Sequence, residues 1–355
     1  MSRPLLVTAD PDALEDLLRL AATAGVEVDV AHDVPTARRC WGTASLVVLG
    51  PDLVDRFARG RLGRRSRVVV LGRDLDDGSI WQRAVEVGAE HVVFLPDAEP
   101  WLVEAFAEAV EGPGREGALV AVLGGRGGAG ATILACALAR TAVRREVTTL
   151  LVDGDPLGGG IDLVFGGEIV TGLRWPDLGA TRGRLPAQAL AEALPRLDGL
   201  SVLSWDRGEV TPLSVEAVRA VIGAARRSWD LVVVDLPRTL DEASREVLTS
   251  ATTVFLVVPA EVRAAAAAAR VAGRAGLFCS DLRLVVRGPA PAGLAAADMA
   301  AALGLPLAGQ VRAEPGLGLD LERGEAPGRR SRSPLAGLCR QLLDDVLPAE
   351  QRLAA

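Results

Sequence analysis

The sequence of 355 residues contains no lysine, no asparagine and no tyrosine, so all 39 of its basic residues are arginine. The absence of lysine excludes a Schiff-base lysine, a lysine general base and a lysine phosphate clamp. Any site that ordinarily depends on lysine must use arginine, use backbone N–H groups, or be inactive. Coding bias in a GC-rich genome explains most of these absences, because arginine replaces lysine on most surfaces.

Sulfur and imidazole side chains are also scarce. The sequence has two histidines and four widely spaced cysteines, which are Cys40, Cys136, Cys279 and Cys339. No two cysteines form a CxxC pair, and the spacing fits no zinc site. We interpret the cysteines as small apolar residues in a reducing cytoplasm.

Charge and hydropathy exclude two further classes of protein. The formal net charge of -7 argues against a protein that coats nucleic acid. No uncharged apolar run approaches the roughly 20 residues that cross a bilayer, and Asp10 and Asp12 precede any long apolar region. We expect a cytoplasmic protein without a signal peptide and without direct membrane insertion.

Short apolar runs alternate with helical patterns over residues 1–111, which predicts parallel βα units in a doubly wound sheet. The predicted strands are Leu5–Val7, Val26–Val30, Leu46–Leu49, Val68–Leu71 and Val92–Leu95. Five strands in this length indicate a flavodoxin-like domain. Gly and Pro then interrupt the pattern, so 112–117 is predicted to be a linker and 118–355 a second α/β domain.

A glycine-rich stretch, Gly125-Arg-Gly-Gly-Ala-Gly-Ala-Thr132, lies between an apolar strand and a helical run. This context is typical of a phosphate-binding loop, in which backbone N–H groups and a helix N-terminus receive the anion. The predicted binding residues are Gly125, Arg126, Gly127, Gly128, Ala129, Gly130, Ala131 and Thr132. The pattern GxxxxGK[ST] is met except that the lysine position is Ala131, and Thr132 keeps the hydroxyl expected to contact Mg²⁺.

Carboxylates end two later apolar strands. Asp153 and Asp155 follow Leu150–Val152, and Asp235 ends the run Leu231–Val234. A carboxylate at a strand end near a phosphate loop is where a Walker B aspartate holds the Mg²⁺ shell, so Asp235 is predicted to bind Mg²⁺ through water. The alternative for each aspartate is a strand-end residue that caps a helix.

Taken in order, these segments resemble the MinD/ParA ATPases. The loop resembles their deviant Walker A motif KGGxGK[ST], residues 153–162 their switch I, and residues 235–237 their Walker B entry. Residues 304–311 and 322–327 resemble their late conserved segments. The resemblance implies a P-loop NTPase domain of the MinD/ParA type, with ATP and Mg²⁺ as cofactors. It also implies a catalytic role for Asp155 in switch I, and it places Arg126 at the signature lysine that reaches the partner's ATP in a dimer.

The departures from this pattern concern the two lysines and one asparagine. Arg126 keeps the positive charge of the signature lysine and can bind phosphate. Ala131 cannot, and loss of such a donor costs about 10²–10³ in rate. The adenine-reading asparagine of the family is also missing near Arg287. We therefore predict weak or absent ATP hydrolysis; the alternative is a loop kept only for folding and dimer contacts.

Residues 1–111 resemble a response-regulator receiver domain that lacks its phosphorylation residues. Asp10 keeps part of the acidic pair, but Gly50 occupies the acceptor position, with Asp52 two residues later. Gly72 replaces the hydroxyl residue, and Leu95 stands where lysine precedes proline. We predict a pseudo-receiver used for docking or dimerisation; Asp52 as a displaced acceptor is the alternative.

A pseudo-receiver joined to a MinD/ParA-like domain is similar to the CpaE/TadZ group, and the loop resembles its actinobacterial branch, the septum-site-determining (Ssd) proteins. The resemblance implies a spatial regulator or scaffold that acts in septum-site selection or in positioning pilus or secretion machinery. It further implies a homodimer, partners among cell-division or pilus and secretion proteins, and recruitment to the septum or cell pole through those partners.

Two other functions stay open at this point. An active ATP-driven positioning switch is favoured by Thr132, Asp155 and Asp235. A nucleic-acid-binding regulator would use Arg329, Arg330 and Arg332 on phosphates; we expect no specific nucleic acid, because a solvated loop also explains these arginines.

The last helical pattern, Leu335–Leu347, carries an apolar stripe at helical spacing. MinD relatives end in a basic helix that binds membranes, but Asp344, Asp345 and Glu350 oppose anionic lipids here. We therefore predict that this helix packs on the core of its own domain.

Overall fold

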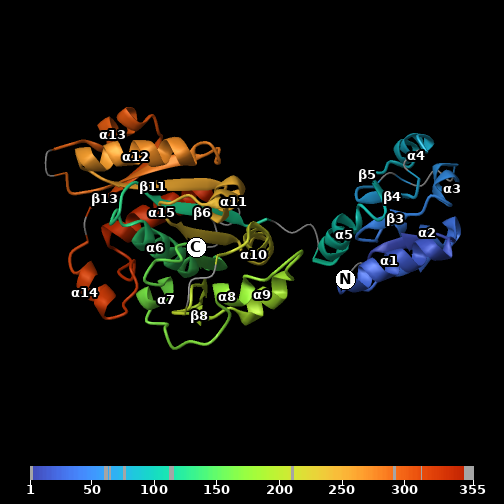
Figure 1. The fold of residues 1–355 in the computed structure, drawn as a ribbon, viewed down its shortest axis with the longest axis horizontal. Helices are drawn as coiled ribbons and strands as arrows, with labels where there is room; N and C mark the ends of the chain where they lie inside the picture. The colour runs from blue at the N-terminus through green and yellow to red at the C-terminus, as the bar shows by residue number, and fades with distance from the viewer. Residues whose placement is uncertain are drawn as a thin grey trace. The chain divides into compact units, whose positions relative to one another are not determined.

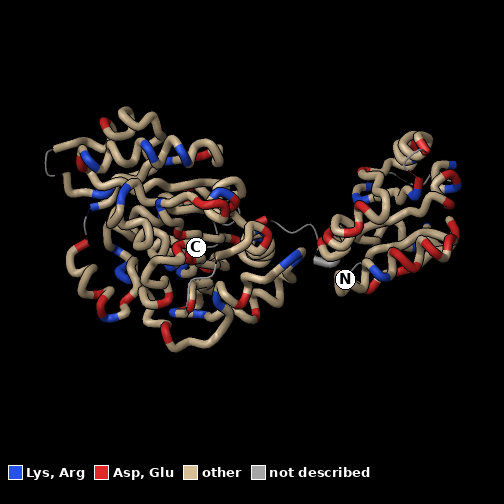
Figure 2. The backbone as a smooth tube through the Cα atoms, viewed as in Figure 1, with Lys and Arg blue, Asp and Glu red and all other residues tan. Residues whose placement is uncertain are grey.

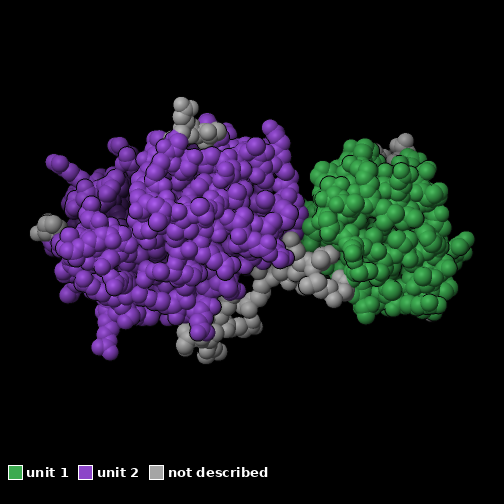
Figure 3. Space-filling view, turned by 90° about the horizontal axis from the view of Figure 1, so that it is seen from below, with its two compact units in different colours: residues 1–114 green, residues 115–355 purple. Residues whose placement is uncertain are grey.

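The computed structural model describes residues 3–59, 63, 65–74, 77–111, 116–208, 212–290, 293–312 and 314–347. The chain forms two compact units, residues 1–114 and 115–355 (Figures 1 and 3). Residues 112–115, most of the predicted linker, lie outside the described residues. Each unit is an α/β fold, as the sequence predicts.

The first unit contains a parallel five-stranded sheet of order β2-β1-β3-β4-β5. Its strands are β1 (Leu5–Val7), β2 (Asp29–Ala31), β3 (Val47–Leu49), β4 (Val68–Gly72) and β5 (His91–Phe94). Its helices are α1 (Pro11–Thr23), α2 (Val34–Trp41), α3 (Val54–Arg59), α4 (Ser79–Val87) and α5 (Glu99–Glu111). This strand order is that of flavodoxin-like folds, so the predicted class is confirmed.

Helices cover both faces of this sheet. Leu17 of α1 and Phe106 of α5 pack in one buried cluster, and Trp41 of α2 and Phe57 of α3 pack in the other. The first helix begins at Pro11, because the Asp10 carboxylate accepts hydrogen bonds from the amides of Asp12 and Ala13.

The predicted strand Val26–Val30 is largely wrong, since β2 begins only at Asp29. Gly25 takes a left-handed conformation with φ of 68°, and the amide of Val26 donates to the carbonyl of Ala21 at 3.0 Å. The chain therefore stays attached to the end of α1 before it joins β1.

The second unit contains an eight-stranded sheet of order β13-β12-β11-β6-β10-β7-β9-β8, parallel except for the β8–β9 pair. Its strands are β6 (Ala118–Gly124), β7 (Thr149–Asp153), β8 (Arg196–Leu197), β9 (Leu200–Leu203), β10 (Leu231–Leu236), β11 (Thr253–Pro259), β12 (Leu282–Arg287) and β13 (Leu307–Val311). Its helices are α6 (Ala131–Arg144), α7 (Ile161–Val164), α8 (Trp175–Leu178), α9 (Ala187–Ala193), α10 (Val215–Ser228), α11 (Glu242–Ser250), α12 (Val262–Ala275), α13 (Ala296–Leu303), α14 (Leu317–Glu322) and α15 (Pro334–Val346).

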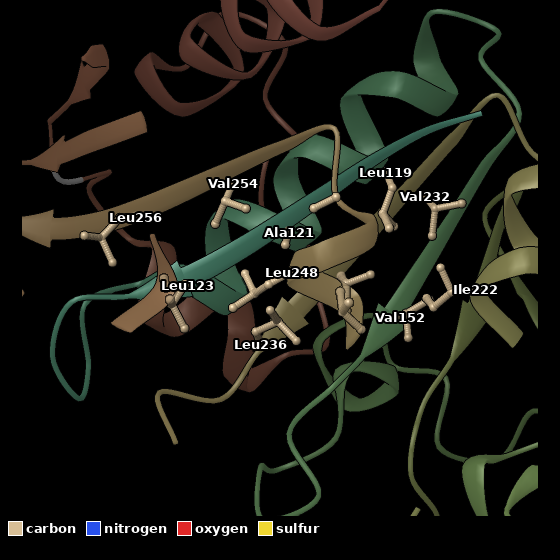
Figure 4. Close-up of a cluster of buried hydrophobic side chains, with 14 of the residues drawn as sticks. Leu119, Ala121, Leu123, Val152, Ile222, Val232, Leu236, Leu248, Val254 and Leu256 are labelled. Atoms are coloured by element: carbon tan, nitrogen blue, oxygen red, sulfur yellow. The ribbon is translucent and has the colours of Figure 1, made fainter. Parts of the chain in front are cut away.

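The central strands are apolar along their whole length because helices bury both faces of the sheet. Figure 4 shows one face, where Leu119 and Leu123 of β6 and Leu236 of β10 pack with Ile222 of α10 and Leu248 of α11. Helices α6 and α15 cover the other face, as their shared buried cluster shows.

The last helix packs as predicted on its own domain. Its apolar stripe is buried against the cluster that contains α6; the buried residues include Leu335, Leu338, Leu342 and Leu343. Within the residues that the structure describes, no helix is both long enough and apolar enough to cross a membrane.

Candidate functional site

The glycine-rich loop joins the end of β6 to α6 at the carboxyl edge of the larger sheet. Gly128 and Gly130 have φ values of 67° and 96°, which favour glycine over any residue with a Cβ. The loop is fixed at its start, where the amide of Gly125 donates to the carbonyl of Val257 at 2.9 Å. No side chain caps α6, whose N-cap is Gly130. The loop thus has the conformation and location of a phosphate-binding loop.

The structure brings together Thr132 and Asp235, the two predicted Mg²⁺ residues. The Thr132 hydroxyl donates to Asp235 Oδ2 at 2.6 Å, and Asp235 lies level with Asp153 on the adjacent strand. Both carboxyls are almost fully buried. Burial raises the pKa of Asp235 to about 7; the hydrogen bond from Thr132 opposes this, and the charges of Asp153 and Asp155 add to it. The hydroxyl and the carboxylate both offer oxygen atoms, which are the ligands that Mg²⁺ binds.

Asp153 is held by its own hydrogen bonds. Its carboxylate accepts from the amide of Ile161 at 2.9 Å, the amide of Asp155 at 3.2 Å and the hydroxyl of Ser204 at 3.1 Å. Burial nevertheless raises its pKa to about 6. Among the described residues no group of three or more potential metal ligands forms. A bound Mg²⁺ would therefore complete its coordination with water or with oxygens of the ligand.

Asp155, the predicted switch I residue, lies in the turn after β7. Its carboxylate accepts from the amide of Leu157 at 3.0 Å, and its carbonyl accepts from the amide of Gly158 at 3.1 Å. It is only partly buried, so its side chain is accessible from solvent near the loop.

Arg126, at the signature position, makes an ion pair within its own chain. Its Nη2 lies 2.7 Å from Oε1 of Glu261, which directly precedes α12. The side chains are 35% and 40% exposed, so the pair is a surface interaction that another anion can displace. Sequence reasoning missed Glu261, because nothing local relates it to the loop.

Sequence reasoning also missed a buried charge cluster at Asp162, at the end of the segment that resembles switch I. Asp162, 1% exposed, lies 3.2 Å from Arg207 and 3.6 Å from Arg174. Its partners are distant in sequence, so only the fold brings them together. Asp162 lies in the first turn of α7, so these ion pairs tie the start of that helix to Arg174 and Arg207.

A cavity of about 240 Å³ adjoins the loop at Gly130. Its walls come from the start of α6, from β11, β12 and β13, and from residues that follow β13. Arg287, which ends β12, extends over the loop so that its Nη1 would lie 3.6 Å from a Cβ on Gly130. The cavity continues the loop toward the β12 side of the sheet.

In the first unit, side chains already fill the place of a receiver's acceptor. The Asp52 carboxylate accepts from the Thr8 hydroxyl at 2.7 Å and from the amide of Ala9 at 2.8 Å. A Cβ on Gly50 would lie 2.4 Å from Asp52 Oδ1. Asp10 pairs with Arg73 at 2.9 Å. Asp52 is thus held by hydrogen bonds, and Asp10 is paired with a cation.

We expect no phosphorylation of this unit, because the Asp52 carboxylate is engaged by two hydrogen bonds. Incubation of the full chain with radiolabelled acetyl phosphate and Mg²⁺ should leave it unlabelled. Labelling that disappears in Asp52→Ala would show instead that Asp52 is a displaced acceptor.

The arginines considered for nucleic acid have local partners. Arg329 lies 2.5 Å from Glu325, and Arg330 lies 3.2 Å from Asp320. Along both units, arginines and acidic residues are intermixed (Figure 2). This arrangement favours the solvated-loop interpretation.

Sequence comparisons relate nearly the whole chain to proteins of Mycobacterium tuberculosis. Residues 7–117 match the family described as "Rv3660c-like, CheY-like N-terminal domain". The chain is 46% identical over 343 residues to protein Rv3660c of Mycobacterium tuberculosis H37Rv, with 96% of each chain covered. Protein MT3760 of strain CDC 1551 matches to the same extent.

Comparisons of structure concern the larger part of the chain. A ParA family ATPase from Chlorobium tepidum matches with a TM-score of 0.58 and 15% identity, over 63% of this chain and 96% of that one. The septum site-determining protein MinD of Pyrococcus horikoshii, solved with Mg-ADP, matches with a TM-score of 0.56 and 18% identity, over 67% and 98%. MinD of Aquifex aeolicus matches with a TM-score of 0.54 and 20% identity, over 65% of this chain and 98% of that one. These likenesses show a MinD/ParA fold.

Proposed function

The chain belongs to the family of the Mycobacterium tuberculosis protein Rv3660c, and from this and its two folds we propose that it is a spatial regulator or scaffold. Its processes would be septum-site selection or the positioning of pilus or secretion machinery, as in the CpaE/TadZ and Ssd proteins that it resembles. Its nucleotide site would bind ligand but hydrolyse it weakly or not at all. The front unit would serve as a pseudo-receiver for docking or dimerisation.

The observation that carries this proposal is the loop itself. It keeps left-handed glycines and the Thr132–Asp235 pair, which suit phosphate and Mg²⁺, yet Ala131 offers no cation. Binding uses backbone donors and the helix N-terminus, whereas hydrolysis needs stabilisation of the charge that develops in the transition state. The site therefore favours binding of a nucleotide over hydrolysis of that nucleotide. When bound, Mg²⁺ would supply charge neutralisation for phosphate oxygens.

A dimer that does not depend on hydrolysis is part of the proposal. Arg126 pairs with Glu261 of its own chain, so it would reach a partner's nucleotide only after that ion pair opens. Recruitment to the septum or cell pole would come from protein partners, consistent with the absence of a spanning helix in the described residues.

An active ATP-driven positioning ATPase is the second candidate, and the Thr132–Asp235 hydrogen bond favours it. Calorimetry with Mg-ATP, with phosphate release measured on the same sample, separates the two. We expect binding with turnover near background. Sustained turnover that Asp155→Ala abolishes would support the ATPase, and absence of any nucleotide binding would refute both.

A further inference from the structure

The cavity beside Gly130 is suited to an aromatic ring attached to a phosphate group. Its walls are mostly apolar; the apolar lining residues include Ile133, Val257, Val285, Val311 and Leu317. It begins at the last glycine of the loop, so a ligand that places phosphates on the loop can extend a flat ring into this space. Such apolar cavities with few polar groups take their specificity from those groups.

Three charged residues line the cavity, Arg287, Arg312 and Glu314, and within the described residues no ion pair joins Glu314 to either arginine. Arg287 is partly buried, and within the described part of the chain its guanidinium makes no hydrogen bond or ion pair. Glu314 also lines the cavity, and its buried Oε2 has no hydrogen-bond partner among the residues that the structure describes. Buried polar atoms without partners cost free energy. A ligand with donors for Glu314 would remove that cost, and acceptors on the same ligand would pair with Arg287.

We propose that this cavity is a base subsite that selects guanine nucleotides over adenine nucleotides. The inference rests on the proposed nucleotide binding and names the base. Guanine presents two neighbouring acceptors, O6 and N7, which an arginine contacts in bidentate fashion. Its N1–H and N2 amino group are donors that a carboxylate such as Glu314 accepts.

Adenine presents the opposite chemistry at two of these positions. Its C6 amino group is a donor and would face the donors of Arg287. Its N1 is an acceptor and would face the Glu314 carboxylate. A site whose polar groups oppose the wrong ligand discriminates strongly, because both partners lose hydrogen bonds that water supplied. The two charges thus favour guanine and disfavour adenine together.

The test is calorimetric titration of the full chain with GDP and, separately, with ADP, each with Mg²⁺. Diphosphates keep the measurement free of turnover. We expect GDP to bind at least tenfold more tightly than ADP. Equal binding, or tighter binding of ADP, overturns the selectivity and leaves the proposed nucleotide binding intact. Binding of neither nucleotide overturns both.

Variants locate the selectivity. Glu314→Gln should weaken GDP binding at least tenfold and change ADP binding less than threefold. The matched control is Glu322→Gln, because Glu322 is exposed on α14 and does not line the cavity; it should change neither. Arg287→Asn should shift the preference toward ADP. An equal loss of both ligands in Glu314→Gln, at unchanged melting temperature, would assign Glu314 a structural role and contradict the proposal.

Discussion

Ala131→Lys should raise nucleotide hydrolysis by about 10² or more over the wild-type chain, because it restores a cation where transition-state charge develops. Position 131 is the first residue of α6 and is partly exposed, so a long side chain has access to the loop. Phosphate release would be measured with Mg-ATP and with Mg-GTP, so that the base preference does not obscure the result.

Ala131→Met is the matched control, since it adds length without charge and should leave turnover at the wild-type level. The double variant Ala131→Lys with Thr132→Ala should lose the gain, because the hydroxyl beside Asp235 is then missing. If Ala131→Lys hydrolyses nucleotide no faster than Ala131→Met, the missing lysine is not the reason that the wild-type site hydrolyses weakly.

Asp235→Asn should stabilise the ligand-free chain at pH 8 and have little effect near pH 4. The carboxyl has a pKa of about 7 in the folded state, raised mainly by burial, and of about 3.9 when unfolded. Between these values the folded state holds a proton that the unfolded state has released. The free energy of unfolding therefore falls as the pH rises between these two pKa values, and above the higher value it falls no further on this account.

Asparagine carries no charge and its amide oxygen can still accept from Thr132. At about 1.4 kcal/mol per pKa unit, Asp235→Asn should raise the free energy of unfolding at pH 8 by roughly 2 to 4 kcal/mol. Urea unfolding at pH 8 and pH 4 measures it. Asp345→Asn serves as the control on an exposed carboxylate. A gain that is the same at both pH values would show that ionisation of Asp235 is not its source.

Much of this fold is readable from local sequence, because its signals are local. Each apolar run that ends in Gly, Pro or Asp marks a buried strand, and parallel strands bring their carboxyl ends to one edge. For that reason the sequence predicts that Thr132 and Asp235 share one site, and a hydrogen bond joins them. The loop was recognisable because its glycines lie between a strand and a helix.

The rest of the site depends on strand order, which the sequence does not state. Arg287 reaches the loop from β12, which β11 separates from β6. Glu261 meets Arg126, and Arg207 meets Asp162, across distances in the chain that no periodic pattern encodes. Glu314, whose Oε2 has no partner among the described residues, could be recognised only from the cavity that it lines.

The filled acceptor position of the first unit has a consequence for timing. The output of a receiver that is phosphorylated rises and falls with the activity of its kinase. With Asp52 held by Thr8 and Ala9, this unit would present one constant surface. Regulation of the protein would then act through the ligand bound to the larger unit and not through phosphorylation of the first unit.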